Sequence, residues 1–162
     1  MNNIFKRLFK IGQSEAHSAV DQLENPIKLT EQGIRDMKEN LDKSLQSLAQ
    51  VKALSIRARN DVETYNDAAQ DYERKALMLL KKAQAGEMKS EEADRLASEA
   101  LVKKEANIGQ ANRSMAEKEK FDKSISELDQ NIKTIRSTIS KWENELKTLK
   151  ARVKVSDATK RL

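Results

Sequence analysis

The fold is decided by residues 34–83, which read IRDMKENLDKSLQSLAQVKALSIRARNDVETYNDAAQDYERKALMLLKKA. Apolar and small residues recur along this stretch in alternating steps of three and four, which is the spacing of a heptad repeat. The recurring positions are Ile34, Met37, Leu41, Ser44, Leu48, Val51, Ser55, Ala58, Val62, Tyr65, Ala69, Tyr72, Ala76, Leu79 and Ala83. A stripe of this length indicates a helix that faces a partner helix from end to end.

A second stripe with the same alternation follows in the C-terminal half. Its members are Ala93, Ala97, Ala100, Lys104, Asn107, Ala111, Ser114, Lys118, Phe121, Ile125, Leu128, Ile132, Ile135, Ile139, Trp142, Leu146, Leu149 and Val153. Between the stripes, Gly86 is suited to end a helix, and Ser90 followed by Glu91 is typical of a helix start. A short turn between two such stripes predicts an antiparallel hairpin.

The fold class that we expect is all-α, a long antiparallel helical hairpin (coiled coil) preceded by a short N-terminal amphipathic helix. Pro26 follows Asn25, a helix-capping residue, and is placed to begin the first long helix. The expected segments are an amphipathic membrane-binding helix at 1–20, a linker at 21–25, the first hairpin helix at 26–84, the turn at 85–90, the second hairpin helix at 91–155, and the start of a further helix or a tail at 156–162.

Two features qualify the hairpin. Its stripes are rich in alanine near the turn and in larger residues further away, which predicts a looser turn end and a firmer far end. Four polar residues also occupy the second stripe, namely Lys104, Asn107, Ser114 and Lys118. Either they lie at the edge of the seam with their charged ends in water, or they mark a bend or joint near 104–118, where Gly109 also weakens the helix.

Residues 1–20 lie outside the two stripes and have a different pattern. At helical spacing, one face carries Ile4, Phe5, Leu8, Phe9 and Ile11, and the other carries Lys6, Arg7 and Lys10. A helix with this division suits an anionic membrane surface, because the apolar face enters the headgroup boundary and the cations meet lipid phosphates. Docking on another subunit is the alternative, since an amphipathic face can bind either a membrane or a protein.

Composition argues against catalysis. The 162 residues include one histidine, His17, and no cysteine, so histidine-based triads, thiol chemistry and thiolate metal sites are excluded. There is no glycine-rich phosphate loop, and we expect the many carboxylates to form solvated pairs one helical turn apart, such as Glu99 with Lys103. The sequence predicts no enzyme, cofactor or metal site. Nucleic-acid binding is also not expected, because the net charge of +5 comes without a recognised binding module.

Two stretches resemble a known family. Residues 24–37, ENPIKLTEQGIRDM, look like the start of the first hairpin helix in the phage shock protein A family, which includes the vesicle-inducing protein in plastids and belongs to the ESCRT-III superfamily. Residues 5–9, FKRLF, resemble the N-terminal amphipathic helix of that family. The resemblance covers essentially the whole chain and is most specific from Pro26 to Met37.

The resemblance implies a peripheral membrane protein that assembles into rods or rings and stabilises or remodels anionic or stressed membranes. It implies a place in the cytoplasm, on the inner face of the cytoplasmic membrane. The implied membrane-binding residues are Ile4, Phe5, Lys6, Arg7, Leu8, Phe9, Lys10 and Ile11. In some members the hairpin restrains an AAA+ transcriptional activator, so a coiled-coil regulatory module is the alternative. Family members usually continue into further helices, so we expect a shortened or naturally short form.

Overall fold

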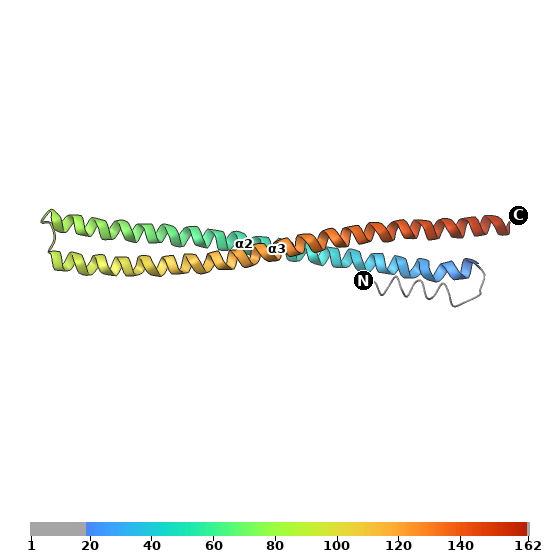
Figure 1. Ribbon diagram of the computed structural model, residues 1–162, viewed down its shortest axis with the longest axis horizontal. Helices are drawn as coiled ribbons and strands as arrows, with labels where there is room; N and C mark the ends of the chain where they lie inside the picture. The colour runs from blue at the N-terminus through green and yellow to red at the C-terminus, as the bar shows by residue number, and fades with distance from the viewer. Residues whose placement is uncertain (1–18, 162) are drawn as a thin grey trace. The chain divides into compact units, whose positions relative to one another are not determined.

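A computed structural model describes residues 19–161. These residues form two long helices, α2 (Ala19–Gln84) and α3 (Ser90–Lys160), joined by a short turn that lies at the left of Figure 1. The described part of the chain contains no strand and no helix long and apolar enough to cross a membrane. The prediction of an all-α hairpin of two long helices is confirmed. The N-terminal helix predicted at residues 1–20 lies outside the described residues, except for its last two positions, which belong to α2.

The described chain divides into two compact units. The first, here called the terminal unit, joins the described residues up to Ser47 with those from Leu128 onward. The second, the turn unit, is Leu48–Glu127 and contains the turn. In each unit a section of α2 packs against a section of α3.

The predicted linker at 21–25 is wrong, because α2 already begins at Ala19 and Pro26 lies inside it. Proline cannot donate a backbone hydrogen bond, and in a helix interior this costs about 3 kcal/mol. Pro26 is buried, so burial offsets part of that cost. Asn25 is therefore an exposed residue within the helix and not its cap.

The far end of α3 also differs from the prediction. The helix continues to Lys160, so neither its expected end at residue 155 nor a separate element at 156–162 is correct. The Thr159 hydroxyl donates to the Val155 carbonyl oxygen at 2.8 Å, in step with the helical repeat. Residues 156–160 contain no glycine or proline, so nothing in the local sequence interrupts the helix.

The turn is built around Gly86. Its φ is +74°, in the left-handed region that glycine adopts without steric cost. The Gly86 amide donates to the Ala83 carbonyl at 3.1 Å, and the Glu87 amide donates to the Lys82 carbonyl at 3.0 Å. This pair of bonds is a Schellman motif, which satisfies carbonyls left without partners at the end of α2. The backbone conformation, and not lack of space, calls for glycine, since no atom would lie within 4 Å of an added Cβ.

Every predicted seam position is buried or half-buried. The core of the terminal unit consists of Ile34, Met37, Ile135, Ile139 and Trp142, with Leu41 and Leu146 packed against it. The core of the turn unit contains Ala76, Ala97 and Ala100, with Tyr72 and Leu79 packed against it. The two cores thus differ in side-chain size in the predicted direction, while the difference in local stability stays a prediction.

One close contact in the terminal unit joins the two helices. A Cβ placed on Gly33 would lie 2.2 Å from Cζ3 and 2.9 Å from Cε3 of the Trp142 indole. The indole therefore lies directly against the α2 backbone, and only glycine leaves room for it. Trp142 is 2% exposed, as expected for a seam residue.

We expect Gly33→Ala to destabilise the protein by about 1–3 kcal/mol, because the indole must move out of its place. Helix propensity alone predicts the reverse, because alanine is about 1 kcal/mol more favourable than glycine in a helix interior. A loss of stability in Gly33→Ala would therefore report the contact with the indole. Gly109→Ala is the matched control, since an added Cβ there meets only the Arg113 guanidinium at 3.8 Å. The control should stabilise by about 0.5–1 kcal/mol in urea unfolding. Equal effects of the two substitutions would contradict the contact.

We further expect amide hydrogen exchange to be slower in the core of the terminal unit than around Ala76 and Ala97. Each large apolar side chain contributes about 1.5–3 kcal/mol on full burial, and alanine contributes much less. Protection should therefore be at least about tenfold greater at residues 132–142 than at 93–100. Uniform protection along both helices would contradict this.

Candidate functional site

The predicted membrane-binding residues lie outside the described part of the chain. They are Ile4, Phe5, Lys6, Arg7, Leu8, Phe9, Lys10 and Ile11. The first described helix, α2, begins at Ala19, only eight residues after Ile11. Their role therefore stays a prediction, and the described residues show the helices to which this segment is attached.

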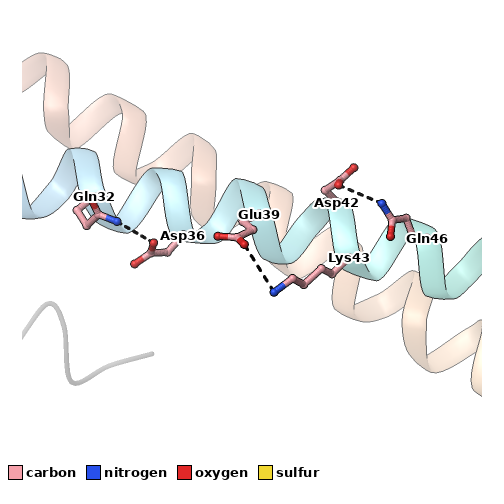
Figure 2. Close-up of polar contacts among 6 residues, drawn as sticks. All are labelled: Gln32, Asp36, Glu39, Asp42, Lys43 and Gln46. Atoms are coloured by element: carbon pink, nitrogen blue, oxygen red, sulfur yellow. Dashed lines mark hydrogen bonds and ion pairs between the residues drawn. The ribbon is translucent and has the colours of Figure 1, made fainter.

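The exterior of α2 carries polar side chains that pair one helical turn apart (Figure 2). The Gln32 amide donates to Asp36 at 2.9 Å, the Lys43 ammonium lies 3.6 Å from Glu39, and the Gln46 amide donates to Asp42 at 3.3 Å. Pairs of this kind are exposed and contribute about 0.3–0.5 kcal/mol each. They are the solvated face of a coiled coil.

The expected pairing of Glu99 with Lys103 is replaced by another arrangement. The Glu99 carboxylate lies 3.5 Å from the Arg95 guanidinium, on the preceding turn. The Lys103 ammonium instead lies 5.7 Å from the centroid of the Tyr72 ring on α2, and Lys75 lies 5.0 Å from the same ring. The face of an aromatic ring attracts cations at these distances through its quadrupole.

Ion pairs also connect α2 with α3 within each unit. In the terminal unit, Lys38 lies 3.3 Å from Glu143, and Lys150 lies 3.5 Å from Glu31. In the turn unit, Lys104 lies 3.4 Å from Glu73. Exposed pairs of this kind contribute little stability, but complementary charges beside a seam favour one pairing of the helices over others.

The polar stretch of the second stripe remains in the seam. Helix α3 passes through 104–118 without interruption, and Ser114 is 8% exposed. The side chains of Lys104 and Lys118 are 24% and 28% exposed, so their stems are covered while their charged ends reach carboxylates. The Asn107 amide donates to the Lys103 carbonyl at 2.8 Å. These contacts agree with the first alternative, in which the long polar side chains lie at the edge of the seam, and not with a bend or joint near 104–118.

Asp122 joins this polar stretch to α2. Its carboxylate accepts a hydrogen bond from the Lys118 ammonium and a second from the Ser55 hydroxyl, at 2.6 Å. The hydrogen bond from Lys118 has the largest effect on the Asp122 carboxyl, and that from Ser55 the next largest. Both favour the charged carboxylate, so the pKa of Asp122 lies below its ordinary value of 3.8. Ser55 is itself 7% exposed, so its hydroxyl needs this partner.

The described residues do not form a metal site, since no three acidic or histidine side chains among them are grouped to hold an ion. His17 and the N-terminal residues lie outside that search.

The turn unit carries one surface that the sequence analysis missed. On α2, Leu77 and Met78 are 53% and 56% exposed, although their neighbours Ala76 and Leu79 face α3. Lys81 and Lys82 follow one turn further on, in the last turn of α2. The signal was present in the sequence, because Leu77 and Met78 fall outside the heptad stripe.

Comparison with known proteins assigns the family. The model of the PspA/IM30 family matches residues 3–162, nearly the whole chain. The chain belongs to the PspA/IM30 family. The stretch from Pro26 to Met37, on which the resemblance was most specific, lies within the matched region, and so do residues 4–11.

Three similar proteins are named as membrane-associated proteins. The chloroplastic Membrane-associated protein VIPP1 of Oryza sativa subsp. japonica is 26% identical over 151 residues, which cover 93% of this chain and 45% of the relative. Membrane-associated protein Vipp1 of Nostoc punctiforme is 26% identical over 162 residues, covering 98% and 58%. The chloroplastic VIPP1 of Arabidopsis thaliana is 25% identical over 154 residues, covering 95% and 44%. The chain spans about half the length of these curated relatives.

We expect Asp122→Asn to lower the melting temperature at pH 7, because the amide cannot form the ion pair with Lys118. A carboxyl whose pKa is lowered by folding stabilises the folded state above its ordinary pKa, and that contribution disappears as the pH falls through the lowered value. The difference between variant and wild type should therefore shrink below pH 3.8.

Asp67→Asn is the control for this titration, since Asp67 is exposed and makes no ion pair within the described residues. Thermal unfolding followed by circular dichroism measures both variants. A difference between Asp122→Asn and wild type that persists unchanged in acid would show that the amide disturbs packing and that the charge is not the cause.

Proposed function

We propose that this PspA/IM30 family protein is a peripheral membrane-binding, self-assembling protein that stabilises or remodels anionic or stressed membranes as an ESCRT-III-like polymer. The family match and the membrane-associated relatives support the membrane role. The proposed place of action is the inner face of the cytoplasmic membrane.

The observation that carries the proposal is the division of residues 4–11 into an apolar and a cationic face. At helical spacing, Phe5 and Phe9 would fall on the apolar face, whereas Lys6, Arg7 and Lys10 would fall on the opposite face. A helix of this kind lies in the interface, with its apolar face about 5–10 Å into the headgroup and acyl boundary. Folding on the membrane costs conformational entropy, which burial of the apolar face offsets.

Self-assembly would raise the membrane affinity that such a short segment provides. A single short helix binds a membrane weakly, whereas many copies held on one polymer bind with an avidity that needs no new contact. The two long helices supply a scaffold for that array, because their seam is buried in both units. Exposed apolar side chains outside the seam, such as Leu54 and Ile56 at 42% and 52%, offer surface for contacts between copies.

We expect Phe5→Glu combined with Phe9→Glu to reduce co-flotation with small anionic liposomes strongly, because two carboxylates would have to enter the lipid boundary. Helicity by circular dichroism should not change. Val102→Glu combined with Val155→Glu is the matched control, since both side chains are exposed, at 69% and 66%, and the added charge is the same. The control should still float.

Flotation that is undiminished by the phenylalanine substitutions would contradict the proposed site at residues 4–11. Loss of flotation by both double variants would show that net charge, and not position, controls binding. If the wild-type chain itself fails to float, the regulatory coiled coil becomes the better account of the fold.

We also expect binding to anionic liposomes to weaken with added salt. The Debye length falls from about 10 Å at 0.1 M to about 3 Å at 1 M, which screens Lys6, Arg7 and Lys10 from lipid phosphates. Flotation over a salt series measures the effect. Binding that does not respond to ionic strength would assign the attraction to apolar insertion alone.

A further inference from the structure

The end of α2 in the turn unit carries an exposed surface that the seam does not use. Leu77 and Met78 lie beside three cations at an open, shallow hollow near the turn. We call this surface the turn patch. Its residues are Arg74, Leu77, Met78, Lys81, Lys82 and Glu87.

Helical spacing places these side chains on one face. Steps from residue 74 to 77 and 78, and then to 81 and 82, follow successive turns of α2. The intervening residues Ala76 and Leu79 belong to the core of the turn unit. The turn patch therefore points away from the seam and has no partner within the described residues.

The charges on the turn patch are unbalanced. Arg74 lies 3.2 Å from Asp71, whereas Lys81 and Lys82 form no ion pair within the described part of the chain. Cations in the last turn of a helix favour its negative end, which accounts for Lys81 and Lys82 in part. It does not account for two large apolar side chains, each more than half exposed, on the same face.

The size of the turn patch argues against a stable protein partner. Residues 74–85 span about 18 Å of a helix about 10 Å wide, which gives a face of about 200 Å². A stable protein interface covers about 800 Å² on each side. A bilayer sets no such minimum, because apolar side chains can enter the headgroup boundary singly while nearby cations meet phosphates.

We propose that the turn patch is a second lipid contact, separate from residues 4–11, at which Leu77 and Met78 enter the headgroup boundary of an anionic bilayer. The ammonium groups of Lys81 and Lys82 bind the lipid phosphates. The two contacts share no residue, so this inference does not depend on the N-terminal one, and each can fail alone.

A fluorescent label at position 78 tests the turn patch. The chain has no cysteine, so Met78→Cys in the full chain accepts a polarity-sensitive dye at a single site. Val102→Cys is the matched control, because Val102 is 69% exposed but is flanked one turn away by Glu99 and Glu105. The probes are vesicles of phosphatidylglycerol mixed with phosphatidylcholine, and vesicles of phosphatidylcholine alone.

We expect the emission of the label at position 78 to shift to the blue with phosphatidylglycerol vesicles, while the label at position 102 does not shift. Lys81→Glu combined with Lys82→Glu should remove the shift without changing helicity. Flotation of the same samples measures membrane binding by the whole protein. Repeating both measurements in a chain that also carries Phe5→Glu and Phe9→Glu measures how far binding depends on the N-terminal contact.

The outcomes separate the two proposals. Flotation without a shift at position 78 overturns the second contact and leaves the membrane function in place. A shift at position 78 that persists when residues 5 and 9 carry glutamate supports the turn patch on its own. An equal shift with vesicles of phosphatidylcholine alone contradicts the proposal that the turn patch binds an anionic bilayer. A shift that appears without vesicles as protein concentration rises identifies a second copy as the partner and also overturns the proposal.

Discussion

Burial of one stripe of each long helix against the other is the interaction on which each unit depends. Long helices are marginal in water on their own, and most of their stability in proteins comes from packing an apolar face. Here that face is narrow, because charged residues make up 35% of the chain and occupy the remaining faces. The terminal unit has large side chains around Trp142, and the turn unit has alanines around Ala97. Each unit is held by one seam.

A narrow seam of similar residues could pair in more than one register, and the structure contains contacts that favour one. The Trp142 indole lies against the backbone at Gly33, which any larger residue would block. In the turn unit, Ser55 donates to Asp122, so a shifted pairing would leave a buried hydroxyl without its partner. Such contacts select one arrangement even where they add little stability.

The seam also explains where function can lie. With one stripe of each helix buried, the outer faces are available, and parts of them carry exposed side chains paired one turn apart. Among the places that depart from that pattern are the amphipathic segment at residues 4–11 and the turn patch at Leu77 and Met78. Both combine apolar side chains with cations, which is the combination that an anionic bilayer accepts.

The sequence by itself determined the helices, the seam and the turn, because heptad spacing and the left-handed preference of Gly86 are local properties. It also supplied the whole candidate membrane segment, which lies outside the described residues. Local rules failed at Pro26, where a favoured start position gave way to a helix already begun at Ala19. Tertiary structure alone decided that Trp142 meets Gly33 and that Ser55 meets Asp122, since residues more than sixty apart come together only when the helices pair. It likewise decided which apolar residues near the turn stay exposed, because exposure depends on what the partner helix covers.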